Sequence, residues 1–363
     1  MALLVIVLLG CRAKQRLDLA PEEPPEPLVN TLQLEAGTLC ILTTPDRVDC
    51  IDGKNEESFQ VPNGMRSVVG CGNCVEGPAG RWRCRNLPDF LLGGKASSPQ
   101  LEPLAPFDGA SQLADNGYTG CFVRAGQVFC WGFAEQGGEL GYLIGEGESC
   151  YFMRRTIPCS AVPRAVLGLD RADSIAHSNF NFCARKQDGT AWCWGTFIDG
   201  VPFGPQRCTT RGAREHAGVP CVSPQARQIE GLPWLAGIVG RGLGFWGVAR
   251  DGALFAWGDK RDQDPYRARP VAGLSSVRKM TANCALQLDG RVRCLGNDRE
   301  TWTEVPGVGP AVDIAEETYG PCAMKRDRSV WCSGSVAEGL AAGNPQPGGT
   351  DQSATRRVWP RGG

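Results

Sequence analysis

Side chains that could act as a catalytic base are scarce in this sequence. Only two histidines occur, His177 and His216, and His216 lies in a polar insertion where it is expected to be solvated. A serine or cysteine nucleophile needs a partner base, and no residue set here supplies one. We therefore predict no catalytic residues and no enzyme activity.

Three aspartates recur in a way that could suggest a carboxylate site: Asp188, Asp251 and Asp289. Paired carboxylates for glycoside cleavage must project into one cleft, and nothing in the sequence places these three together. Each directly precedes a glycine in a turn pattern, where aspartate is favoured for its local hydrogen bonds. We interpret them as turn residues, and a hydrolase or lyase acting in a central pocket remains the least favoured alternative.

Cysteine could also bind a metal, and the chain has 18 copies. Cys71 and Cys74 have the spacing of a zinc or redox pair, but no second such pair exists to complete a zinc site. Dense cysteine use points to an oxidising compartment, because cytosolic reductants keep thiols reduced. We expect disulfides, and no bound metal or cofactor.

The charge balance excludes another class of function. The chain has 38 Lys plus Arg and 39 Asp plus Glu, for a net charge of −1. Grooves for nucleic acid and faces for anionic membranes both need clustered cations. We therefore predict no nucleic-acid partner.

The first eleven residues resemble a bacterial lipoprotein leader. An apolar run, Ala2 to Leu9, is too short to span a bilayer and ends at Leu8-Leu9-Gly10-Cys11. This tetrad resembles a lipobox, in which Cys11 would carry the lipid. The positive charges that normally precede such a run are missing, so either the start lies upstream or the resemblance is accidental.

Residues 12–30 are rich in proline and glutamate and are expected to form an extended tether. No later stretch is apolar enough to cross a membrane. We expect an exported protein held at the outer membrane or cell surface by its lipid alone, with a periplasmic or secreted protein as the alternative.

A repeat emerges when the cysteines are aligned. Six pairs, nine or ten positions apart, mark six copies: Cys40 and Cys50, Cys74 and Cys84, Cys121 and Cys130, Cys183 and Cys193, Cys284 and Cys294, Cys322 and Cys332. Another copy, fifth in order, has Trp246 and Ala256 at the two positions. Self-similarity of this kind is the signature of a repeat architecture.

The spacing fits a β-hairpin. In the copies with ten-residue spacing, three-residue loops ending in glycine, such as Leu288-Asp289-Gly290, would set the cysteines directly opposite each other. The third copy has a two-residue loop, Ala125-Gly126, and a spacing of nine, so the shorter loop and the shorter spacing compensate. Residues ten apart on a helix would be about 15 Å apart, too far for a disulfide.

These hairpins predict an all-β fold. Each is preceded by a short apolar stretch and followed by a turn and a further short segment, which gives four strands per unit. We predict a seven-bladed β-propeller over residues 31–360, with disulfide-stapled hairpins and four-stranded blades. Residues 355–360 would supply the last strand, although which strand closes the ring stays open.

The repeat motifs resemble a known family. Cys183-Ala184, Asp188-Gly189 and Trp192-Cys193-Trp194-Gly195 closely resemble the regulator of chromosome condensation repeat, as does Gly138-Glu139-Leu140-Gly141. The resemblance implies a seven-bladed propeller that works through its rim and faces, and a structural role for His177. Nucleotide exchange on a small GTPase is not carried over, since the motif transfers fold and not activity.

Two insertions, at about 133–165 and 196–228, follow the Trp-Gly of adjacent copies and should emerge from one face. We expect the disulfides Cys150–Cys159 and Cys208–Cys221 to staple them, which leaves Cys71 without a partner. Preordered aromatic and arginine side chains suit a binding surface, and those chosen here are Tyr142, Tyr151, Phe152, Arg154, Arg155, Arg207 and Arg211.

The sequence thus predicts a module at the bacterial envelope that binds a protein or a glycan. The alternatives are a structural component of an envelope assembly and loops that merely cover the face.

Overall fold

The computed structural model describes residues 32–35, 38–44, 47–52, 55–60, 67–69, 74–76, 82–84, 102–103, 107–115, 118–134, 138–145, 148–152, 155–178, 181–196, 222–242, 244–259, 264, 266–296, 300–317, 320–334 and 355–359. The leader, the tether, Cys11, Cys71, Cys208 and Cys221 lie outside this set. Within it, no helix is long and apolar enough to cross a membrane.

The described strands pair into seven antiparallel sheets. The first contains β1 (Leu32–Glu35), β2 (Thr38–Thr44), β3 (Arg47–Asp52) and β4 (Asn55–Gln60). The second contains β5 (Ser67–Val69), β6 (Cys74–Glu76), β7 (Trp82–Cys84) and β8 (Glu102–Pro103). The third contains β9 (Ala110–Asp115), β10 (Thr119–Arg124), β11 (Gln127–Phe133), β12 (Ser149–Phe152) and β13 (Arg155–Ala165).

The remaining four sheets follow the same chain order. The fourth contains β14 (Ala172–Ser178), β15 (Asn181–Lys186), β16 (Ala191–Thr196) and β17 (Val222–Gln228). The fifth contains β18 (Leu235–Arg241), β19 (Gly244–Ala249), β20 (Leu254–Trp257) and β21 (Arg269–Pro270). The sixth contains β22 (Val277–Met280), β23 (Cys284–Gln287), β24 (Val292–Leu295) and β25 (Trp302–Glu304), and the seventh β26 (Ala311–Glu317), β27 (Gly320–Lys325), β28 (Val330–Ser333) and β29 (Thr355–Trp359).

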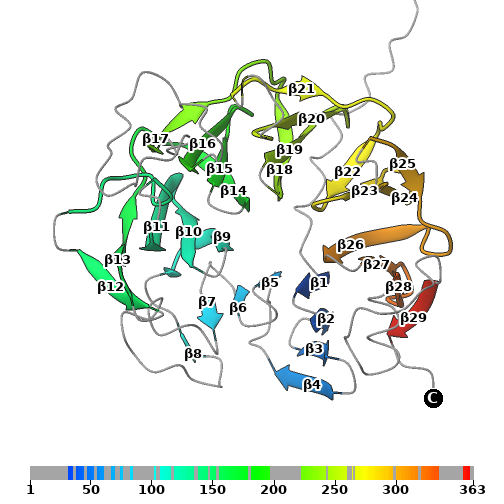
Figure 1. The fold of residues 1–363 in the computed structure, drawn as a ribbon. Helices are drawn as coiled ribbons and strands as arrows, with labels where there is room; N and C mark the ends of the chain where they lie inside the picture. The colour runs from blue at the N-terminus through cyan, green and yellow to red at the C-terminus, as the bar shows by residue number, and fades with distance from the viewer. Residues whose placement is uncertain are drawn as a thin grey trace, which may run out of the picture.

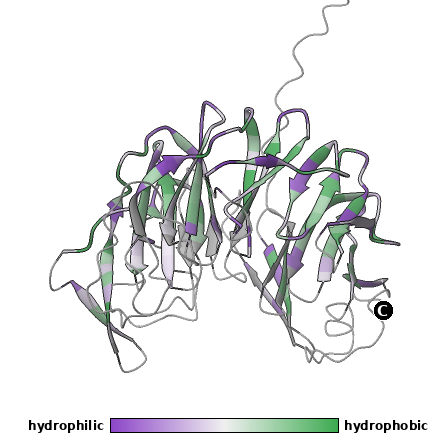
Figure 2. Cartoon of the chain, turned by 45° about the horizontal axis from the view of Figure 1, so that its top comes forward, coloured by the Kyte–Doolittle hydropathy of each residue, from purple (hydrophilic) through white to green (hydrophobic). Residues whose placement is uncertain are grey.

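The sheets are arranged around a central axis as the blades of a β-propeller, with the first strand of each innermost (Figure 1). Side chains are described in six of the sheets and only the backbone pairing in the second. Apolar residues gather in the strands, and many connecting turns are hydrophilic (Figure 2). The expected all-β propeller with four-stranded blades is confirmed, although the third sheet has a fifth strand.

The hydrophobic core is divided among the seams between neighbouring sheets. Each large cluster joins two successive sheets, as where Phe182 of the fourth packs with Val128 of the third. The first and last sheets also share a cluster, in which Leu39 and Ile41 pack with Met324 and Val330. Apolar burial therefore joins the N-terminal and C-terminal sheets without a covalent link between them.

The expected hairpin disulfides join directly opposite residues. Among the described side chains five are present, with Cα atoms 4.0–4.1 Å apart: Cys40–Cys50, Cys121–Cys130, Cys183–Cys193, Cys284–Cys294 and Cys322–Cys332. In the second sheet the backbone register also sets Cys74 opposite Cys84. The cysteine-free copy keeps the same frame, with Trp246 directly opposite Ala256.

The hairpin turns also hold neighbouring sheets together. The carbonyl of the turn glycine accepts a hydrogen bond from the first residue of the next sheet, at 2.8 Å from Ala172 N to Gly126 O and 3.0 Å from Leu235 N to Gly189 O. Gly189 has a positive φ, and a Cβ there would lie 2.5 Å from the Trp234 ring. Glycine is therefore needed both for its conformation and for the close approach.

Candidate binding surface on the third sheet

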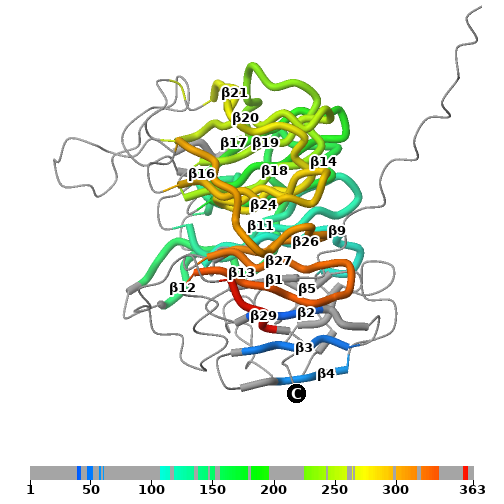
Figure 3. Tube along the Cα trace, turned by 90° about the vertical axis from the view of Figure 1, so that its right-hand side faces the viewer, coloured from blue at the N-terminus to red at the C-terminus, as the bar shows by residue number. Residues whose placement is uncertain are grey.

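The first insertion forms a β-hairpin on the outer side of the third sheet. Strand β13 pairs with β12 along its first half and with β11 along its second half. The hairpin extends outward from the ring (Figure 1) and lies on the left of the side view (Figure 3). The described strands of the insertion therefore belong to the blade.

The second insertion begins and ends at matching points of the fourth sheet. It leaves β16 and returns in β17, just as the first leaves β11 and returns in β13. In both sheets the register between the third strand and the returning strand shifts next to a tryptophan, Trp131 or Trp194. The structure thus places both insertions after the third strand of adjacent sheets, while the interior of the second lies outside the described residues.

A disulfide fastens the first hairpin. Cys150 and Cys159 are bonded, as expected, but they are not directly opposite, since Cys150 pairs with Ile157 in the register. Phe133, Ile157 and Cys159 form a small buried cluster, with Cys150 packed against it. Isolated two-stranded hairpins are marginal in water, so the disulfide and this cluster together keep the hairpin in shape.

Tyr142, one of the residues predicted to bind, lies in the core and not on the surface. Its side chain is buried, and its hydroxyl donates a 2.8 Å hydrogen bond to the carbonyl of Cys130. Burial raises the pKa of this phenol. Tyr142 follows the Gly-Glu-Leu-Gly segment and belongs to the core between the third and fourth sheets, so it stabilises the base of the insertion.

An ion pair fixes the loop before β12. Arg164 donates to the carboxylate of Glu148, and its guanidinium lies 5.8 Å from the centre of the Tyr142 ring. The Gly145 amide also donates to Glu148, at 3.4 Å. The bond from Arg164 lowers the pKa of the Glu148 carboxyl below its ordinary value, so this pair keeps its charges at neutral pH.

Large apolar side chains are exposed around this hairpin. Tyr151 is 77% exposed and Leu143 72% exposed, and neither position is needed to complete the core. The exposed large apolar residues of this sheet and the segment after it are Tyr118, Leu143, Tyr151, Val162 and Leu167, which we call the third-sheet surface. Among the described residues, only Trp234 and Leu288 are comparable outside it.

Backbone hydrogen bonds bring parts of this surface together. Leu167 N donates to Gly141 O at 3.0 Å, which brings Leu167 near the loop of Leu143. Phe133 N donates to Tyr118 O at 2.9 Å, so Tyr118 lies at the base of the insertion. Tyr151 lies at the outer end, on β12.

Most of the other residues predicted to bind have side chains outside the described set. Phe152 ends β12 and Arg155 begins β13, but their side chains are outside the described set, as are Arg154, Arg207 and Arg211 entirely. Leu143, Val162 and Leu167 were not predicted, because only aromatic and arginine side chains were chosen as binding residues. Apolar residues inside an insertion rich in glycine and glutamate were the available signal.

The recurring aspartates serve the turns, as interpreted from the sequence. Asp188 accepts hydrogen bonds from the Thr190 hydroxyl at 2.6 Å and the Thr190 amide at 3.1 Å, and these bonds lower its pKa. Asp327 is bound in the same way by Ser329. Over the part of the chain that the structure describes, no group of three His, Cys, Asp or Glu side chains could hold a metal ion.

The disulfides bear on where the protein resides. Six are present among the described residues, five in the blades and one in the hairpin. Such bonds persist in oxidising compartments and are rare in the cytosol. They indicate an extracellular or otherwise exported protein.

Comparison with known proteins shows similarity of fold. No protein-family model matches the chain, and no curated protein matches it. Human WBSCR16 is similar in structure, with 13% identity, a TM-score of 0.50, and coverage of 77% of this chain and 82% of that one. Prp20p of Saccharomyces cerevisiae, the yeast RCC1, binds Gsp1p and histones, and is similar with 15% identity, a TM-score of 0.49, and coverage of 89% and 77%.

A bacterial surface protein is also among the similar structures. PorZ, a component of the type-IX secretion system of Porphyromonas gingivalis, matches with 8% identity and a TM-score of 0.47, covering 80% of this chain and 35% of that one. At these identities the similarities concern the propeller fold alone.

Proposed function

We propose that this protein is an exported recognition module that binds another protein through the third-sheet surface. In this proposal Cys11 carries a lipid that holds the propeller at the bacterial envelope, and the seven sheets are seven blades of one closed ring. The protein acts by binding, without catalysis.

One observation carries the proposal: exposed large apolar side chains concentrate on the third sheet. Exposed apolar patches on a soluble fold mark interaction sites more often than chance. Tyrosine contributes a large contact area at low conformational-entropy cost, which suits the centre of an interface. The disulfide, the ion pair and Tyr142 order the hairpin in advance, which lowers the entropic cost of binding.

The experiment is affinity capture from the envelope of the producing cell, with cross-linking and mass spectrometry. The test variant replaces Leu143, Tyr151 and Val162 with serine, and the matched control replaces Trp234 and Leu288. Trp234 directly precedes β18 of the fifth sheet and Leu288 lies in the turn between β23 and β24 of the sixth, so both control positions lie outside the third sheet.

A protein that cross-links to the third sheet, and is lost only with the test variant, would support the proposal. Capture that is equal for all three proteins would contradict it. Stoichiometric co-purification with membrane proteins that survives the test variant would favour a structural component instead. Retention on a glycan array with no protein captured would favour a glycan ligand.

A further inference from the structure

The outermost strand of the third sheet has an open edge. Strand β12 pairs with β13 on one side, and no described strand pairs with it on the other. The order of strands in this sheet is β12-β13-β11-β10-β9. Backbone groups on such an edge are free to pair with another extended chain.

The register shows which backbone groups face outward. In an antiparallel pair, residues that exchange both hydrogen bonds alternate with residues that do not. Cys159 N donates to Glu148 O, and Pro158, opposite Ser149, has no N–H to donate. Ser149 and Tyr151 therefore lie at positions that point their N–H and C=O groups away from β13.

Five other sheets protect their outermost strands with described side chains. Charged residues and prolines discourage pairing with a foreign strand. The protecting residues are Glu57 in β4, Arg227 in β17, Arg269 and Pro270 in β21, Glu304 in β25, and Arg356 and Arg357 in β29. Strand β12 is Ser-Cys-Tyr-Phe and has neither a charge nor a proline.

The unprotected strand is also the one that is fastened in place. The Cys150–Cys159 disulfide joins it to β13, and Ser149 and Tyr151 on it are exposed. A short edge strand held rigidly, without protection, is a template for strand addition. A flexible hairpin would lose this advantage through the cost of ordering it.

We propose that β12 binds an extended segment of a partner protein, which adds to the third sheet as a further strand. The inference rests on the proposed function and names how its partner is recognised. The N–H and C=O groups of Ser149 and Tyr151 supply the ladder bonds. The exposed Tyr151 ring selects an aromatic or β-branched residue opposite it, since such cross-strand pairs are favourable.

The test uses the full chain and a displayed library of random linear peptides as the probe. Enriched peptides are then measured against Ser149→Pro, which removes an outward N–H, and Ser149→Ala, which retains it. Intact mass confirms the Cys150–Cys159 bond, and circular dichroism confirms the fold. Tyr151→Pro and Tyr151→Ala form a second pair that separates the backbone group from the ring.

We expect each proline variant to bind about tenfold more weakly than its alanine counterpart, which is the loss expected for about one hydrogen bond. Equal affinity within each pair, with both Tyr151 variants weakened, would overturn strand addition and leave side-chain binding by the third-sheet surface intact. Enrichment of no peptide would overturn the proposal. Self-association that Ser149→Pro abolishes would replace the partner segment with a second copy of this chain.

Discussion

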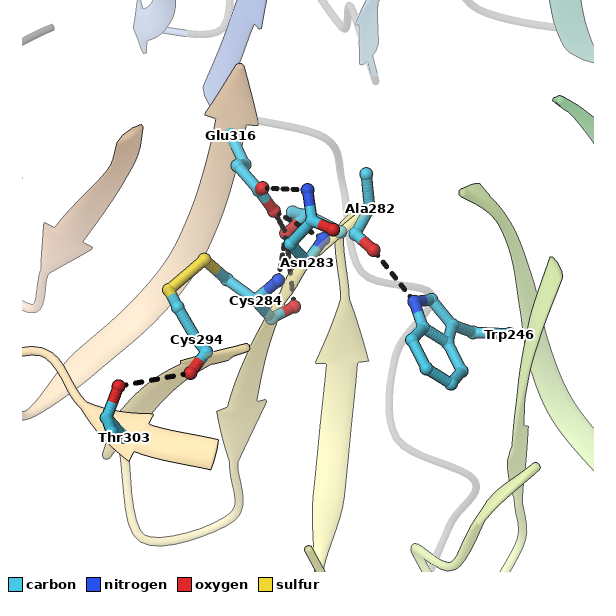
Figure 4. Close-up of a disulfide and its surroundings, with 8 residues drawn as sticks. Trp246, Ala282, Asn283, Cys284, Cys294, Thr303 and Glu316 are labelled. Carbon is cyan, nitrogen blue, oxygen red and sulfur yellow. Dashed lines mark hydrogen bonds between the residues drawn. A yellow bond between two sulfur atoms is a disulfide. The ribbon is translucent and has the colours of Figure 1, made fainter. Parts of the chain in front are cut away.

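The fifth and sixth sheets both belong to the ring of blades, but the central pair of residues in their hairpins is stabilised in different ways. At the central pair of the hairpin, the sixth sheet has the disulfide Cys284–Cys294 and the fifth has Trp246 opposite Ala256. The disulfide acts within its own sheet. Trp246 reaches beyond its sheet, because its indole N–H donates a 2.8 Å hydrogen bond to the Ala282 carbonyl of the next one (Figure 4).

The seams that follow these two sheets differ in the same way. Between the fifth and sixth sheets, Trp246 packs in an apolar cluster with Met280 and Trp302. Between the sixth and seventh, Glu316 accepts hydrogen bonds from the Thr281 hydroxyl and from the Asn283 amide and side chain, at 2.5–2.7 Å (Figure 4). Both seams also contain an apolar cluster. After the disulfide-closed hairpin the contacts of Glu316 add hydrogen bonds to that cluster, whereas in the fifth sheet Trp246 both packs within the hairpin and crosses the seam.

The largest effect is expected from Trp246→Ala. It removes a buried side chain from the seam and leaves the Ala282 carbonyl without its donor, so the free energy of unfolding should fall by about 3–5 kcal/mol. Equilibrium denaturation measures it, and Leu288→Ala, at an exposed position, should change stability by less than about 0.5 kcal/mol. A loss as small for Trp246→Ala as for the control would show that the fifth sheet does not depend on this residue.

Replacing both Cys284 and Cys294 with alanine should cost about 2–3 kcal/mol, as expected for closure of a short loop. The effect should stay local. Hydrogen exchange should show lost protection in β23 and β24 and unchanged protection in β19 and β20. Equal loss in both sheets would mean that the disulfide supports the seam as well as the hairpin.

Glu316→Gln tests the polar seam. It keeps the shape but removes the charge that strengthens three hydrogen bonds, so stability should fall by about 1–2 kcal/mol. A double-mutant cycle with Asn283→Ala measures the coupling across the seam. Additive effects of the two substitutions would contradict a direct contribution of this contact.

Replacing the Trp246–Ala256 pair of the fifth sheet with a disulfide is expected to change the free energy of unfolding by a smaller amount. In the double variant Trp246→Cys, Ala256→Cys, the opposed positions should form a disulfide. The gain of about 2–3 kcal/mol within the hairpin should fall about 1 kcal/mol short of the packing lost from the seam. Mass spectrometry detects the disulfide, and equilibrium denaturation measures the net change in the free energy of unfolding. A variant more stable than the parent would show that closing the hairpin stabilises the fold more than the packing of Trp246 in the seam.

The smallest expected effect is on thermal stability at acidic pH. The Arg291 amide and side chain hold the pKa of Asp289 below its ordinary value of 3.8. A carboxylate with a lowered folded pKa stabilises the fold above its ordinary pKa, and this stabilisation is lost as the pH falls through the lowered value. Asp289→Asn should therefore flatten the fall in thermal stability below about pH 4, and an unchanged acid profile would contradict this.

The cysteine spacing predicted the fold well because it depends on local geometry. Loop length and cysteine separation together determine which residues are opposite, so the register of Cys121 with Cys130 and of Trp246 with Ala256 followed directly. The seams were not predictable, because the contact of Glu316 with Asn283 joins residues from different copies and leaves no periodic trace.

The exposed residues of the third sheet were predicted only in part. Tyr151 is exposed as expected, whereas Tyr142 is buried, although both are tyrosines in the same insertion. Tertiary packing causes the difference in burial. Tyr142 follows a segment that packs on the fourth sheet, whereas Tyr151 lies on a hairpin that extends beyond that sheet. The diagonal pairing of Cys150 and Cys159 also depends on a register that the irregular insertion does not encode.

The order of the disulfides along the chain has a consequence for biogenesis. In every described bond, the partner of a cysteine is the next cysteine in the described sequence, nine or ten residues away. Hairpins form in about 1–10 μs, so as a chain emerges during export each pair meets before the following pair appears. Oxidation can then proceed in order of emergence with little need for isomerisation. The apolar seam between the first and seventh sheets, by contrast, cannot form until the seventh sheet has emerged.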